Sequence, residues 1–208
     1  MAWAGAGLTL GGDLKAFLVS SLIAALLAGQ ASAARPETPP PASAAPDFDI
    51  DRLLAHPENA DPDLYAVTVQ ALWERGDRAQ AFFWYTVFVT RAGVMLGILS
   101  ETREEGDEEE YEIPLGLRLS GFEALQWALS DQDMARTVVQ RALDYEARLP
   151  PPPYFPGELW SAHAGTVRAD MQKAMAQFPD DVEAYRRRTG RYIGPWKDAG
   201  KPLDEAWR

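Results

Sequence analysis

The chain has 208 residues, a formal net charge of −11 at pH 7 and no cysteine. The acidic balance argues against a nucleic-acid partner, because proteins bind nucleic acids by neutralising phosphates with Lys and Arg. Without cysteine the chain has no disulfide, thiol nucleophile or cysteine-ligated metal, so an apolar core must stabilise the fold alone.

Residues 1–33 have the pattern of a signal peptide. Lys15 precedes an apolar run, Ala16–Ala28, which has the length of a signal-peptide core, roughly 7–15 residues. Ala31-Ser32-Ala33 is an A-x-A cleavage site, so we expect a mature chain that begins at Ala34 and is exported to the periplasm or the extracellular space. Two alternatives stay open: an uncleaved segment that contacts the membrane, and a buried N-terminal helix.

Residues 34–46 form a linker with five prolines among small residues. This composition is typical of an extended, poorly ordered spacer. We expect a helical domain over residues 47–190 and an irregular tail over residues 191–208. The domain should begin with a short amphipathic helix around residues 48–54, which Pro57 ends.

A helical hairpin is predicted over Asp61–Ala92. Asp61 and Pro62 suit the start of its first arm, and Gly76 suits the left-handed residue that ends a helix. Asp77 and Gln80 then make a D-x-x-Q pair, a variant of the capping box.

The second arm of this hairpin is apolar on nearly every side. Its run FFWYTVFVT, residues 82–90, is rich in residues that favour strands, so a strand is the alternative. The caps, and the absence of Gly or Pro before Gly93, favour a helix. A helix that is apolar all round belongs in the middle of a bundle, so the rest of the chain must supply neighbours on both flanks.

An acidic segment, Glu101–Glu112, carries eight carboxylates and one arginine. Like charges repel one another in a compact form, so we expect a solvated loop. The alternative is a small β-hairpin in which residues 94–100 and 111–117 pair across the loop. Six carboxylates are candidate partner-binding residues: Glu104, Glu105, Asp107, Glu108, Glu109 and Glu110.

A second hairpin is predicted over residues 120–146. Ser120 with Glu123 makes a capping box, and Ser130 with Asp133 repeats the pattern at the turn. The core face of its second arm is expected to contain Met134, Val138, Ala142 and Tyr145, widened by Ala135, Val139 and Leu143. Four prolines, Pro150–Pro153, then form a stiff polyproline segment.

A longer amphipathic helix is predicted from about Gly157 to Phe178. Pro179 should stop it, and a short helix capped by Asp180 and Glu183 should continue to Thr189. Three arginines of the short helix are a candidate contact for an acidic surface: Arg186, Arg187 and Arg188. A solvated helix end with favourable cations is the plainer interpretation of the same cluster.

These elements predict an all-α bundle of about six helices, built from two antiparallel hairpins and a long C-terminal helix. The first hairpin resembles tetratricopeptide and Sel-one-like repeats: Leu72-Trp73-x-x-Gly76 and Ala81-x-x-Trp84-Tyr85 match their small residue at the helix crossing and their aromatic pair. The second hairpin follows at an offset of 54 residues, longer than the roughly 34-residue tetratricopeptide period.

The resemblance implies helix pairs with a concave face that binds proteins, either stacked as a solenoid or packed as a compact bundle. It carries no catalytic residue over to this chain. We expect the hairpin grooves near Tyr65, Trp73 and Trp127 to be the second candidate partner-binding surface.

Metal motifs are absent from the sequence. The two histidines, His56 and His163, lie far apart and fit no zinc spacing. Calcium loops counted from Asp47 or Asn59 lack the glycine that the sixth position needs. We therefore expect no metal and no other cofactor.

The sequence thus predicts an exported, non-catalytic protein-binding module, and more specifically an envelope immunity or inhibitor protein. Its partner would be a protein, and membrane contact would come only from an uncleaved signal segment. The alternative is an envelope enzyme that acts on cell-wall polymer through carboxylates. Glu158, beside Trp160, is the best candidate for that chemistry.

Overall fold

The computed structural model describes residues 49–102, 121, 124–125, 127–128, 131–189 and 198–207, without the side chains of residues 63, 175 and 177–189. The described part is all-α, as predicted, and contains no strand. Five α-helices pack together: α2 (Ile50–Ala55), α3 (Asp63–Glu74), α4 (Arg78–Thr102), α6 (Gln132–Glu146) and α7 (Gly157–Thr189). Two short 3₁₀ helices are η2 (Pro57–Asn59) and η3 (Glu205–Trp207).

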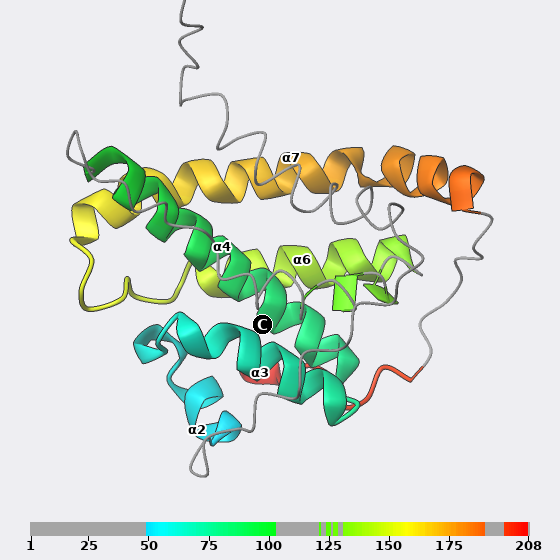
Figure 1. Ribbon diagram of the computed structural model, residues 1–208, viewed down its shortest axis with the longest axis horizontal. Coiled ribbons are helices and arrows are strands. Elements are labelled where there is room, and N and C mark those ends of the chain that lie inside the picture. The colour runs from blue at the N-terminus through cyan, green and yellow to red at the C-terminus, as the bar shows by residue number, and fades with distance from the viewer. Residues whose placement is uncertain are drawn as a thin grey trace, which may run out of the picture.

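Helix α4 is the centre of the bundle. It crosses between α3 on one side and α6 and α7 on the other (Figure 1). Every residue from Ala79 to Met95 is buried, so the predicted helix and its neighbours on both flanks are confirmed. By length and composition α4 could cross a membrane, but 89% of its most apolar window is buried inside the protein.

The turn between α3 and α4 follows from Gly76. This residue has φ +82°, the left-handed conformation that Gly adopts without cost. The Gly76 amide donates to the Trp73 carbonyl and the Asp77 amide to the Leu72 carbonyl, which is the Schellman arrangement. At the other end, α3 begins at Asp63 without a side-chain cap bond at its N-cap, Pro62. Just before it, the Asp61 carbonyl accepts from the Leu64 amide at 2.9 Å.

The β-hairpin alternative is wrong for its first strand, because residues 94–100 continue α4 to Thr102. Residues 111–117 lie outside the described residues. Gly97 lies where α4 meets α7: a Cβ placed there would come within 2.6 Å of Nδ1 of His163. A side chain at this position would therefore displace the His163 ring, and the helix continues through the glycine.

Helix α6 starts one residue away from the predicted cap. Asp131 is its N-cap, and its carboxylate accepts from the Met134 amide at 3.1 Å. Met134 is 45% exposed instead of facing the core. The other predicted core positions are buried, apart from the half-buried Tyr145, and the buried face also includes Glu146: Ala135, Val138, Val139, Ala142, Leu143 and Glu146. The predicted caps at Ser120, Glu123 and Ser130 lie outside the described residues.

Helix α7 runs through Pro179 to Thr189 as one helix of 33 residues, so the predicted break is wrong. A proline inside a helix removes the hydrogen bond of its own nitrogen and crowds the carbonyl four residues earlier, yet the helix continues on both sides of Pro179. At the end of the four prolines the Phe155 amide donates to the Pro152 carbonyl at 3.0 Å, which makes a turn before α7.

Candidate functional site

A buried ion cluster joins the three longest helices. Glu146 of α6 lies between Arg91 of α4 and Arg168 of α7. The Glu146 carboxylate accepts from Nε of Arg168 at 2.6 Å and lies 3.7 Å from Nη1 of Arg91. The side chains of Arg91 and Glu146 are both 0% exposed. This enclosure keeps Glu146 away from any substrate, so the cluster connects helices.

Arg91 has further partners on the same side of α4. Its Nη2 donates to the Pro150 carbonyl at 3.1 Å, and its guanidinium carbon lies 4.9 Å from the centre of the Trp160 ring. Such a cation–π contact is stronger in a desolvated site. Arg91 therefore holds the loop after α6 and the start of α7 against the central helix.

Tyr65 is part of this buried region and is not a partner-binding residue. Its side chain is 1% exposed, and its ring stacks on Phe88 with ring centres 4.1 Å apart. Burial raises the pKa of the Tyr65 hydroxyl to about 12, against the opposing effect of the nearby Arg91 charge. The prediction of Tyr65 at a groove is wrong, because its position on α3 faces α4.

The sequence carries a signal for this cluster at Arg91. Arg91 stands inside an otherwise apolar run. Because an arginine is almost never fully buried without a partner, its position predicts a buried carboxylate elsewhere. The periodicity of α6 places Glu146 on the same face as Val139 and Leu143, which identifies the candidate.

Trp73 and Trp127 are brought together. Their ring centres lie 6.4 Å apart at an angle of 74°, and both side chains are half-buried. The guanidinium of Arg78 lies 5.1 Å from the Trp73 ring centre. This aromatic pair has the partial exposure that a contact surface needs, unlike Tyr65.

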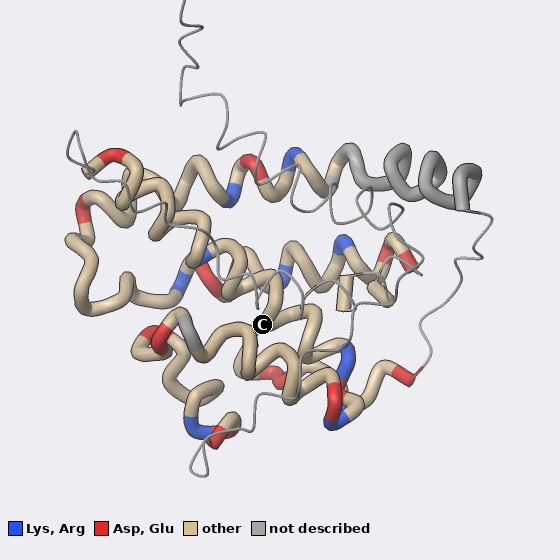
Figure 2. The backbone as a smooth tube through the Cα atoms, in the orientation of Figure 1, with Lys and Arg blue, Asp and Glu red and all other residues tan. Residues whose placement is uncertain are grey.

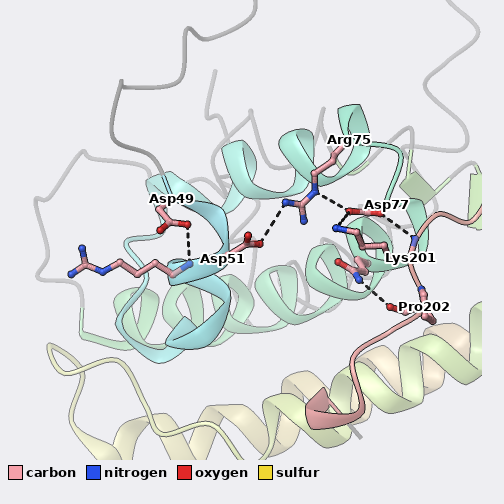
Figure 3. A network of polar contacts seen from close by, with 8 residues as sticks. Asp49, Asp51, Arg75, Asp77, Lys201 and Pro202 are labelled. Atoms are coloured by element: carbon pink, nitrogen blue, oxygen red, sulfur yellow. Dashed lines mark hydrogen bonds and ion pairs between the residues drawn. The ribbon is translucent and has the colours of Figure 1, made fainter.

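Residues 198–207, hereafter the C-terminal strap, lie across the turn between α3 and α4 (Figure 3). The Asp77 carboxylate accepts from Nε of Arg75 at 2.8 Å and from the backbone amide of Lys201 at 3.1 Å. Gln80 donates to the Pro202 carbonyl at 2.9 Å. Asp77 and Gln80, which lie at the start of α4, thus both contact the strap.

The far end of the strap reaches the core. Trp207 is 8% exposed; its ring stacks on Phe83 at 5.2 Å and meets Trp84 edge-on at the same distance. Arg141 of α6 donates to the carbonyls of Asp204 and Trp207. The strap therefore completes the aromatic core between α4 and α6.

A groove of about 710 Å³ lies between α6 and α7. Its apolar lining includes Val139 and Leu143, and its polar lining includes Gln140, Asp144 and Gln172. Charged residues of both signs are scattered over the outside of the described helices, with few along α4 (Figure 2). The groove is thus an open, mixed surface.

The other residues considered from the sequence do not belong to the buried ion cluster or to the strap contacts. His163 contacts Glu101 at 2.7 Å, His56 lies 3.5 Å from Glu58, and Glu158 is exposed in the first turn of α7. No group of three or more metal-ligating side chains occurs in the part of the chain that the structure describes. The acidic candidates at positions 104–110 lie outside the described residues. The backbone of Arg186, Arg187 and Arg188 belongs to α7, while their side chains are outside the description.

Comparison with known proteins finds no family model, no curated protein and no solved structure that matches this chain. The resemblance to tetratricopeptide and Sel-one-like repeats therefore stays a prediction from the residues.

Proposed function

We propose that the protein is an exported, non-catalytic protein-binding module whose partner is a basic protein, with an envelope immunity or inhibitor protein as the specific case. The observation that carries the proposal is the open groove between α6 and α7, which pairs an apolar lining with polar groups. Clefts of this kind bind by burying apolar side chains, while polar groups fix their orientation.

The charge of the chain supports a basic partner. A net charge of −11, with eight carboxylates between Glu101 and Glu112, attracts cations over long range. Such attraction acts mainly on the association rate and weakens with salt. The apolar groove would then supply the short-range contact.

The repeat architecture belongs to this proposal too. We infer that residues 121–128 and α6 form a second hairpin like that of α3 and α4. In support, the described residues among them, 121, 124, 125, 127 and 128, are helical and end just before the α6 cap at Asp131. A pair of such hairpins could present one shared binding face.

Neutralising the acidic segment tests the binding proposal. We expect replacement of Glu104, Glu105, Asp107, Glu108, Glu109 and Glu110 by Gln or Asn to leave the melting temperature within a few degrees, because solvated carboxylates do not stabilise a core. Affinity for a partner captured from a periplasmic fraction and then purified should fall about tenfold or more at low salt, roughly 1.4 kcal/mol. Calorimetric titration at two salt concentrations measures both effects.

The matched control neutralises two carboxylates of α7 outside the acidic segment, with Glu158→Gln and Asp170→Asn. It should leave the partner's affinity within about twofold. If the control lost as much affinity as the variant, the effect would come from net charge and not from the acidic segment. If neither lost affinity, the acidic segment would have no role in binding. A complementary variant, Ala176→Arg, places a long cation in the groove and should weaken binding without unfolding the exposed face of α7.

Export is tested at the N-terminus. If Ala31-Ser32-Ala33 is cleaved, sequencing of the exported protein should begin Ala34-Arg35-Pro36. Replacing Ala33 by Arg should block cleavage and leave a longer product in the membrane fraction. A wild-type product that retains Met1 would contradict the proposal.

A further inference from the structure

The rest of the chain holds the C-terminal strap by its main chain, as peptide-binding proteins hold their ligands. Hydrogen bonds from the helices to its main chain are repeated along its length: the Ala79 amide donates to the Ala199 carbonyl at 3.0 Å, and Gln80 to the Pro202 carbonyl at 2.9 Å. Asp77 accepts from the Lys201 amide. Main-chain bonds give affinity in peptide recognition, and side-chain pockets give specificity.

Two residues of the strap, Gly200 and Trp207, give the strap groove its specificity. Gly200 has φ +75°, and a Cβ there would lie 2.1 Å from the Gly76 carbonyl oxygen, so only glycine fits the close approach. Trp207 fills the aromatic pocket formed by Phe83 and Trp84. Arg141 fixes the end of the strap through the carbonyls of Asp204 and Trp207.

Between these points the strap lies on the surface. Lys201, Pro202, Asp204 and Glu205 are exposed, and Leu203 is half-buried. The residues between the glycine and the tryptophan therefore contribute little buried area. The contacts come from the turn at Gly76 and Asp77 and from helices α4 and α6. A segment with the same spacing of glycine and tryptophan would find the same contacts from another chain.

We propose that the strap groove is a peptide site that is occupied in cis, and that its occupant in trans is the strap of a second copy of this chain. Every copy carries the fitting peptide and the groove, so exchange of straps closes a symmetric dimer in which each partner contributes Trp207 to the other's core. At low protein concentration the chain's own strap occupies the groove. A segment joined to its site by a short flexible connection has an effective concentration on the order of millimolar, which exceeds the concentration of other copies. The exchange does not rest on binding at the groove between α6 and α7, but the two sites adjoin: Arg141 lines that groove and also donates to the Trp207 carbonyl of the strap.

A peptide of residues 198–208 tests the site. We expect a fluorescent version to bind full-length Trp207→Ala protein at least tenfold more tightly than wild type, because the variant's own strap no longer fills the pocket. The same peptide with Trp207→Ala should not bind either protein. Circular dichroism must show that the variant retains its helices.

If Trp207→Ala does not fold, Gly200→Ala takes its place, since it keeps Trp207 and disturbs the strap where it meets the backbone of Gly76 and Asp77. A folded variant that does not bind the peptide overturns the proposal, because the strap is then a permanent part of the fold. The occupant is tested with wild-type protein refolded at high concentration from a mixture of isotope-labelled and unlabelled chains. Native mass spectrometry should find mixed dimers, which Trp207→Ala abolishes. If the peptide binds but the protein stays monomeric at every concentration, the second copy is not the occupant.

Discussion

Glu146→Gln should lower the free energy of unfolding by about 3–5 kcal/mol, the loss expected when one partner of a buried ion pair is removed. The substitution keeps the shape of the side chain but removes its charge. Arg91, with 0% exposure, would then be left with the Pro150 carbonyl and the Trp160 ring as its compensation. Arg168 is 26% exposed and can turn toward water, so the loss comes mainly from Arg91.

Urea melts measure this loss, and a double variant separates its two causes. Arg91→Met with Glu146→Leu replaces the pair by apolar groups of similar size and should recover most of the stability, because apolar replacement of buried pairs is often neutral. The matched control is Asp144→Asn on the exposed face of α6, where the carboxylate accepts from Gln140; surface changes cost about 0.5 kcal/mol or less. A Glu146→Gln loss below about 1 kcal/mol would contradict the view that Glu146 compensates Arg91.

The central helix could be predicted from sequence because its signal is local and redundant. The run around Trp84 is apolar on all sides, and Gly76 marks the turn before it. Both features depend only on nearby residues and on helix geometry. The strand alternative for residues 94–100 failed because α4 continues to Thr102. Within this stretch Gly97 leaves room for His163 of α7, a distant contact that no local pattern shows.

The side-chain partners were harder to predict, because the sequence does not show which distant residues the fold brings next to a polar side chain. Asp77 and Gln80 fit a local capping pattern, yet they bind the strap more than 120 positions later. Tyr65 was assigned to a surface since helical periodicity gives a face but does not say which face a neighbour covers. Trp73 and Trp127 do meet at a half-buried position, which keeps them as candidates, and the acidic candidates stay a prediction.

Trp84 gives the second large effect. It is 0% exposed, and its ring centre lies within 5.2–5.6 Å of the rings of Phe83, Phe88, Tyr145 and Trp207. These neighbours come from α4 itself, α6 and the strap, so the ring joins three parts of the chain. Aromatic pairs contribute about 0.5–1.5 kcal/mol each beyond the area they bury.

Trp84→Ala should therefore cost about 3–5 kcal/mol in urea melts, through lost transfer energy and the cavity left behind. Trp84→Phe should cost much less, since a ring remains and the indole N–H has no hydrogen-bond partner within the described part of the chain. The control is Tyr154→Ala, because Tyr154 is 57% exposed and its loss should stay near 0.5 kcal/mol. If Trp84→Ala cost no more than this control, α4 would not be the centre of the core. If Trp84→Phe cost as much as Trp84→Ala, the indole N–H would have a partner outside the described residues, and the ring contacts alone would not explain the stability.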